Sequence, residues 1–269
     1  GTINLSAPAK DGSLYVSGIG LEGANFYING SDSSLISVPR LGHDGSLLKL
    51  DEYGDLIWSI HPRNVRIEDF AIDTASDDFY VKGNYHHESI FRDVNGDFGN
   101  RSSDFVGEGF LAKFNKLGEH QWIKYEVDSY GITVDPFGNV ITANNTSSRK
   151  LTIESYNPAG ELNWQSEISR TLNGPDIAEL VSDDQGNIYL TGSWFRSGFS
   201  EIIDATAGSF TADSLAGSII VSFSPIGRFR WSQGSLDSST RFITSDHIAI
   251  SGSEIYVAGS ISMDADEMV

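Results

Sequence analysis

The sequence predicts an all-β fold, a β-propeller built from four-stranded antiparallel blades, with about four and a half repeats. Two motifs that alternate along the 269 residues support this prediction. One is Gly-x-x-x-Trp, at residues 54–58, 118–122, 160–164 and 227–231. The other reads DGSLYVSG, SDDFYVKG, FGNVITAN, QGNIYLTG and GSEIYVAG, at 11–18, 76–83, 137–144, 185–192 and 252–259.

Two further strand-like segments complete each repeat. One precedes the tyrosine motif, at residues 68–74, 130–136, 178–184 and 246–252, and the other precedes Gly-x-x-x-Trp, at 45–53, 109–117, 149–159 and 217–226. Both alternate apolar and polar residues and are rich in β-branched and aromatic side chains, which is typical of strands. No segment keeps a helical period over about ten residues, so each repeat is expected to contain four strands.

The repeats predict one propeller domain over residues 1–269, with blades at about 7–64, 65–129, 130–175 and 176–239 and a partial blade at 240–269. The motif glycine is expected to supply a positive φ in a hairpin, and the tryptophan to fill the space between neighbouring blades. The last repeat holds two of its four strands, and closed propellers have about four to eight blades. We therefore expect a fragment of a larger ring.

Composition restricts the classes of partner. The net charge is −19 and the pI is about 4.5, so the surface repels the phosphates of nucleic acid and of anionic membranes. No run approaches the roughly 18 apolar residues of a membrane helix, so we expect no membrane insertion. The chain has no cysteine, which excludes disulfides, thiolate metal sites and a cysteine nucleophile.

The segments between the second and third strands vary most among the repeats. They cover about 19–44, 84–108, 145–148 and 193–216. We expect them to be loops, and variable loops on a fixed scaffold are where binding sites usually lie.

Residues 107–122, GEGFLAKFNKLGEHQW, and 183–194, DDQGNIYLTGSW, resemble the SBBP-type β-propeller repeat of secreted bacterial proteins. The resemblance covers essentially the whole chain. It implies a scaffolding or adhesive module of a secreted or cell-surface protein. Quinoprotein-type repeats also end in Gly-x-x-x-Trp, but they join the tyrosine strand to the next strand by a short turn, unlike the long segments after Tyr15 and Tyr189.

Some residues depart from this repeat pattern. Ile141 and Asn144 replace the tyrosine and glycine of the third repeat, and Ser222 and Ser224 replace the lysine and Asp/Asn of the fourth. These departures indicate degenerate blades and leave the predicted fold unchanged.

The best candidate for a metal site is a calcium loop at residues 93–104. Asp93, Asn95, Asp97 and Asp104 have the spacing of positions 1, 3, 5 and 12 in an EF-hand loop. Phe98 stands where that loop has its glycine, so a solvated polar loop is the alternative.

Other polar residues suggest weaker candidates. Asp73, Asp135 and Asp183 end the first strand of three repeats, where they would either surround a cation or accept hydrogen bonds from turn amides. His86 and His87 are adjacent, and neighbours on a strand point to opposite faces, so they are not expected to share a metal.

The leading functional hypothesis is a non-catalytic propeller module of a secreted or cell-surface bacterial protein, extracellular or periplasmic, with a protein or glycan ligand. No G-x-S-x-G, H-E-x-x-H or P-loop motif is present. The alternatives are a hydrolase or lyase acting on a polysaccharide, and a calcium-stabilised structural module. The enzyme alternative predicts two or three facing carboxylates in a cleft, with aromatic side chains beside them.

Overall fold

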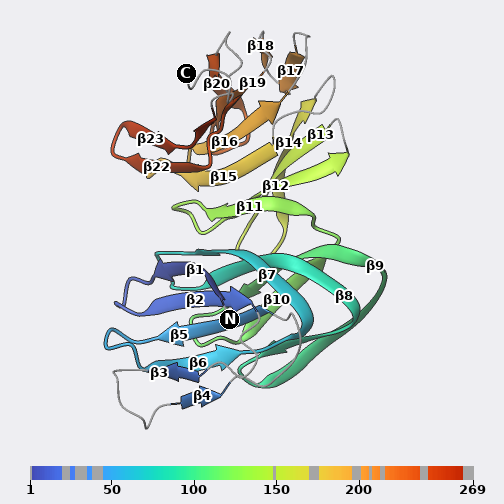
Figure 1. Ribbon diagram of the computed structural model, residues 1–269, viewed down its shortest axis with the longest axis vertical. Coiled ribbons are helices and arrows are strands. Elements are labelled where there is room, and N and C mark those ends of the chain that lie inside the picture. Colours follow the sequence, from blue (N-terminus) through green and yellow to red (C-terminus); the bar gives the residue numbers. More distant parts are fainter. Residues whose placement is uncertain are drawn as a thin grey trace, which may run out of the picture. The chain divides into compact units, whose positions relative to one another are not determined.

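The computed structural model describes residues 2–19, 25–27, 35–37, 45–147, 150–169, 176–195, 201–205, 208–212, 216–236 and 242–262. The regular elements in these residues are all strands. Four-stranded antiparallel sheets follow one another along the chain, which confirms the predicted β-propeller blades (Figure 1). In the described residues, no helix is long and apolar enough to cross a membrane. The chain divides into two compact units, Gly1–Asp128 and Ser129–Val269.

The first unit contains two blades. Blade one is formed by β1 (Thr2–Pro8), β2 (Leu14–Ile19), β5 (Gly45–Leu50) and β6 (Leu56–Ile60), in that order across the sheet. Blade two is formed by β7 (Arg63–Ile72), β8 (Phe79–Asp93), β9 (Gly96–Phe114) and β10 (His120–Tyr125). A short hairpin, β3 (Asn25–Tyr27) and β4 (Leu35–Ser37), lies within the segment 19–44.

The second unit contains two complete blades and a two-stranded one. Blade three is formed by β11 (Ser129–Val134), β12 (Val140–Ser147), β13 (Lys150–Tyr156) and β14 (Leu162–Ser169). Blade four is formed by β15 (Asp176–Ser182), β16 (Ile188–Phe195), β19 (Ala216–Phe223) and β20 (Phe229–Leu236). The two-stranded blade is formed by β22 (His247–Ser251) and β23 (Glu254–Ala258).

Four short strands lie outside the blade pattern of the second unit. β17 (Glu201–Ala205) and β18 (Gly208–Ala212) form a hairpin within the segment 193–216, and β17 pairs with β14 of blade three. This pairing extends blade three to a six-stranded sheet. β21 (Phe242–Ile243) pairs with β24 (Ile261–Ser262).

The motif residues form one transverse row across each complete blade. In blade one, Tyr15 of β2 pairs with Lys49 of β5, and Lys49 pairs with Trp58 of β6. The same register gives the rows Tyr80–Lys113–Trp122, Ile141–Ser155–Trp164 and Tyr189–Ser222–Trp231. Residues aligned across antiparallel strands share a face, so the tyrosine and tryptophan rings meet across the row. Their centroids are 5.8, 5.8 and 5.9 Å apart in blades one, two and four.

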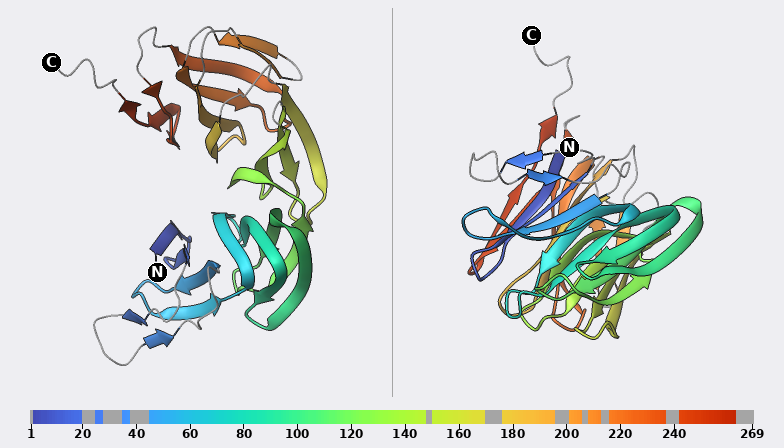
Figure 2. Two further views of the ribbon diagram at one scale, coloured as in Figure 1. Left: turned by 45° about the vertical axis from the view of Figure 1, so that its right-hand side comes forward. Right: turned by 90° about the horizontal axis from the view of Figure 1, so that it is seen from below.

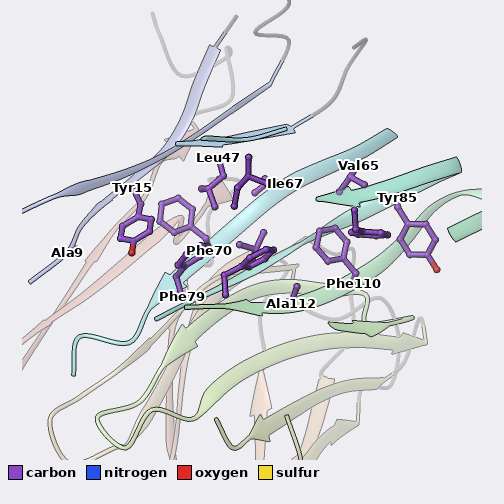
Figure 3. Close-up of a cluster of buried hydrophobic side chains, with 14 residues drawn as sticks. Ala9, Tyr15, Leu47, Val65, Ile67, Phe70, Phe79, Tyr85, Phe110 and Ala112 are labelled. Atoms are coloured by element: carbon purple, nitrogen blue, oxygen red, sulfur yellow. The ribbon is translucent and has the colours of Figure 1, made fainter. Parts of the chain in front are cut away.

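Each unit buries an apolar core between its own blades. In the first unit, Tyr15 and Leu47 of blade one pack with Phe79 and Phe110 of blade two (Figure 3). In the second unit, side chains of blades three and four form the corresponding cluster. Burial of a large aromatic side chain stabilises such a core by about 2–3 kcal/mol.

The motif tryptophan connects one blade to the next. The Trp58 ring stacks on Phe79 of blade two with centroids 5.6 Å apart, and its Nε1 donates to the Lys116 carbonyl at 3.4 Å. In the second unit, Trp164 Nε1 donates to the Pro225 carbonyl of blade four at 3.0 Å. Lys116 and Pro225 hold the same position in their turns, two residues before the motif glycine. The predicted packing of the tryptophan between blades is therefore confirmed for Trp58 and Trp164.

Two structural features require a glycine at this position of the motif. Gly118 and Gly227 have φ of 84° and 74°, which confirms the predicted positive φ. They also lie against the preceding blade, since a Cβ on Gly227 would be 2.3 Å from the Trp164 ring and one on Gly118 would be 3.1 Å from Trp58. The glycine of one repeat therefore makes room for the tryptophan of the repeat before it.

The prediction of a loop at 84–108 is wrong. Strands β8 and β9 run through this segment as one long hairpin, drawn in teal and green in Figure 2. Its turn contains Asn95 and Gly96, a pair that favours tight hairpins. The hairpin also contributes to the core, because Phe91 is only 3% exposed. This insert therefore completes the packing of the first unit.

The tip of this hairpin folds back onto its own unit. The Val94 amide donates to the Gly118 carbonyl at 3.3 Å, in the turn between β9 and β10. Arg92 Nη1 donates to the His61 carbonyl, which follows β6 of blade one, at 3.2 Å. The hairpin thus ties blade two to blade one.

We expect Gly227→Ala to destabilise the chain more than Gly54→Ala. Gly54 has a φ of 86°, and a Cβ placed on it would have no atom within 4 Å, so alanine there costs only the left-handed strain, about 1–2 kcal/mol. Alanine at Gly227 adds overpacking against Trp164, about 1–3 kcal/mol more. Denaturant unfolding of both variants measures the difference, and equal losses would contradict the proposed contact.

We expect the first unit to lose stability as the pH falls below about 6.5, in part through His61. Burial, and then the Arg92 charge, lower the pKa of this imidazole, whose nitrogens lie 3.0 Å from the hydroxyls of Ser46 and Ser59. The unfolded chain therefore takes up the proton first, and the stabilisation is complete above that pH and is lost below it.

Urea midpoints at about pH 7.5 and about pH 5.5 measure this effect. The native chain should lose more stability between the two than His61→Gln. His120, whose pKa burial also lowers, is present in both proteins and cancels in the comparison. An equal loss in both proteins would show that His61 does not contribute.

Candidate functional site

A polar pocket of about 430 Å³ lies in the second unit, between blade four and the β22–β23 hairpin. One side is the turn after β15, with Asp183, Asp184 and Gln185. Tyr189 of β16 and Arg230 of β20 also line it. The other side is the β22–β23 turn, with Gly252, Ser253 and the flanking Ile250 and Ile255.

Asp183 holds the first side of the pocket in place. Its Oδ1 accepts hydrogen bonds from the amides of Gln185 and Asn187 at 2.9 and 2.8 Å. Its Oδ2 accepts from Asn187 Nδ2 at 2.8 Å and from the Tyr189 hydroxyl at 3.0 Å. Burial favours a higher pKa of Asp183, but these hydrogen bonds outweigh it and lower the pKa below the usual value. Asp183 is therefore an anion at neutral pH whose oxygens are already used.

Arg230 takes the place of the lysine that blade four lacks. Its Nη1 donates to the Tyr189 hydroxyl and to Ser222 Oγ, both at 3.1 Å, and its guanidinium carbon lies 6.0 Å from the Tyr189 ring centroid. In blades one and two, Lys49 and Lys113 lie 4.9 and 5.6 Å from the centroids of their tyrosines. Sequence reasoning recognised Ser222 as a departure but missed Arg230, which precedes the motif tryptophan.

Three side chains leave polar atoms open to the pocket. Asp184, Gln185 and Arg230 are exposed. Within the described residues, Arg230 bonds protein only through Nη1, and the side chains of Asp184 and Gln185 make no hydrogen bond. The pocket thus offers guanidinium donors, carboxylate acceptors and a side-chain amide. The segments that carry these groups are held in place by β-strands.

The strand-end aspartates accept hydrogen bonds from turn amides. This was the second of the two roles predicted for them from the sequence. Asp73 Oδ1 accepts from the Ala75 amide at 2.9 Å. Asp135 Oδ1 accepts from the Phe137 and Asn139 amides, both at 2.9 Å. With Asp183, these carboxylates serve to shape turns.

Asp93 and Asn95, from the predicted calcium loop, lie at the tip of the β8–β9 hairpin. Asp93 Oδ1 accepts from the amides of Asn95 and Gly96 at 2.7 and 3.1 Å, and its Oδ2 accepts from the His120 amide at 3.0 Å. In this structure both oxygens of Asp93 therefore receive backbone hydrogen bonds.

The other two predicted calcium ligands lie along β9. Asp97 pairs with Arg92, whose Nε lies 2.6 Å from its Oδ1, and the Asp104 side chain lies outside the described residues. His86 is half-buried and His87 is exposed. No group of three or more His, Asp or Glu side chains in the described part of the chain is arranged to hold a metal ion. Calcium binding at 93–104 stays a prediction.

No protein-family model and no curated protein matches the sequence. A crystal structure of a protein of unknown function from Bacteroides caccae is similar over 71% of this chain and 90% of that chain, with a TM-score of 0.26 and 10% identity. A likeness at this level carries no information about function.

We expect Arg230→Ala to destabilise the second unit by about 1–2 kcal/mol, because it removes one cation–π contact and two hydrogen bonds. Adding Ser222→Lys should recover part of this loss, since lysine holds this row position beside Tyr15 and Tyr80. Urea unfolding of the single and double variants measures the recovery. A double variant no more stable than Arg230→Ala would contradict the claim that Arg230 fills the role of the missing lysine.

Proposed function

We propose that the chain is a non-catalytic module of the SBBP-type repeat, from a secreted or cell-surface protein, that binds a glycan in the pocket beside blade four. One observation carries the proposal: Arg230, Asp184 and Gln185 present to one pocket donors and acceptors that no other described residue uses. Sites of this kind hold a few polar groups on a rigid scaffold. The secreted or surface location is supported by the repeat resemblance.

The charges of the pocket favour a neutral ligand. Asp183 and Asp184 repel an anion, and Arg230 repels a cation. A neutral sugar avoids both costs, and its hydroxyls donate to a carboxylate while they accept from a guanidinium. Ile250 and Ile255 add apolar surface for the carbon–hydrogen face of a sugar.

The carboxylates of the pocket favour binding over hydrolysis. Glycosidases place two carboxyl groups on opposite sides of the scissile bond, and one of them has a raised pKa to act as the acid. Asp183 and Asp184 are consecutive on one turn, and the pKa of Asp183 is lowered. The two carboxylates therefore lie on one side of the pocket, and the lowered pKa leaves Asp183 without the proton that the acid has to donate.

We expect neutral oligosaccharides to bind. Asp184→Ala and Gln185→Ala should each weaken this binding, and the loss of a hydrogen bond to the Asp184 carboxylate should weaken it by about tenfold. Calorimetric titration against a panel of neutral, acidic and amino oligosaccharides provides the measurement. Glu52→Ala is the matched control, since Glu52 is an exposed carboxylate on a β-turn of blade one.

Three outcomes would overturn the proposal. Binding that Asp184→Ala leaves unchanged places the glycan elsewhere. Release of reducing or unsaturated ends during the titration indicates the polysaccharide enzyme. Failure of the whole glycan panel, together with capture of a protein ligand, replaces the glycan by a protein.

A further inference from the structure

The outer edge of β23 differs from that of every corresponding strand. The second strands of the complete blades, β2, β8, β12 and β16, each lie between a first and a third strand. Among the described residues, β23 pairs with β22 alone. Its other edge therefore presents unpaired amides and carbonyls, which is the feature that recruits an added strand.

The side chains of β23 are exposed where their counterparts are buried. Tyr256 is 54% exposed, whereas Tyr15 and Tyr80 are 0% and Tyr189 is 7% exposed. The next residue, Val257, is 39% exposed, whereas its counterparts are at most 6% exposed. Because adjacent strand residues point to opposite faces, both faces of β23 lack the cover that the other blades have.

In the complete blades, part of this cover comes from residues of the third and fourth strands in the same row. Opposite the tyrosine stands a lysine or serine of the third strand, and opposite the next residue stands an apolar one in the three blades that have the tyrosine. These pairs are Tyr15–Lys49 with Val16–Leu48, Tyr80–Lys113 with Val81–Ala112, and Tyr189–Ser222 with Leu190–Val221. The tryptophan of the fourth strand then places its ring beside the tyrosine.

We propose that the edge of β23 binds a strand–turn–strand segment of the chain's own repeat type. Its first strand places lysine or serine opposite Tyr256 and an apolar residue opposite Val257. Its second strand, after a Gly-x-x-x-Trp turn, brings a tryptophan to within stacking distance of Tyr256. Binding adds one ladder of backbone hydrogen bonds and places a tryptophan ring against Tyr256.

This docking would also steady the glycan pocket, although it does not depend on the proposed function. The β22–β23 hairpin supplies one side of the pocket through Gly252, Ser253 and Ile255. A segment held on β23 completes the blade that carries this side.

A peptide with the sequence of residues 107–125, GEGFLAKFNKLGEHQWIKY, tests the proposal, since it is a regular copy of the third and fourth strands. Amide hydrogen exchange of the whole chain is measured with and without excess peptide. We expect exchange across Glu254–Ala258 to slow by tenfold or more, while exchange in β2 stays unchanged. A peptide carrying Leu111→Pro and Lys113→Pro is the control, because proline cannot donate to the ladder.

Tyr256→Ser should weaken peptide binding by about tenfold, since burying the ring is worth on the order of 1.5 kcal/mol or more. Tyr53→Ser, at a tyrosine 69% exposed on a turn of blade one, should leave it unchanged. No slowing in β23, or equal slowing by the proline peptide, would overturn the proposal. So would a free chain that sediments as a dimer with β23 already protected, because a second copy would then occupy the edge.

Discussion

The contact between the tryptophan of one blade and the turn of the next is the interaction on which the arrangement of neighbouring blades depends. The indole nitrogen donates to a turn carbonyl, and the indole ring occupies space that any side chain at the motif glycine would fill. Within each unit, the contact joins the tryptophan of one Gly-x-x-x-Trp motif to the glycine of the next motif along the chain. The two observed pairs are Trp58 with Gly118 in the first unit and Trp164 with Gly227 in the second.

Because this contact recurs, the strands that form it could be predicted from the sequence. Strands such as β11 and β22 were predictable because each repeat has to form the same contacts, and the positive φ of the motif glycines followed from the hairpin. The β8–β9 hairpin was not, because it occurs once and so has no counterpart for comparison. Its local signal, the Asn95–Gly96 pair, was present, but the segment was interpreted as a calcium loop.

The candidate site was harder to predict because its two sides are far apart in the sequence. Asp183 was recognised as a strand-end residue, but the second side, from β22 and β23, is brought to it only by packing. Arg230 was missed for a related reason. Its role depends on the register that aligns Ser222 with Tyr189 and Trp231, and this register places a cation from β20 over a tyrosine of β16. The pocket thus lies where blade four departs from the repeat, while residues that follow the repeat hold the blades together.

The most direct test of this account is a double-mutant cycle between Trp164 and Gly227, measured by denaturant unfolding. If the glycine makes room for the indole, Gly227→Ala should cost much less in a Trp164→Leu background than in the native chain. The predicted coupling is about 1–3 kcal/mol, within the range of about 0.5–3 kcal/mol for residues in direct contact. Additive losses, with a coupling below about 0.5 kcal/mol, would contradict the claim that the tryptophan of one blade determines the glycine of the next.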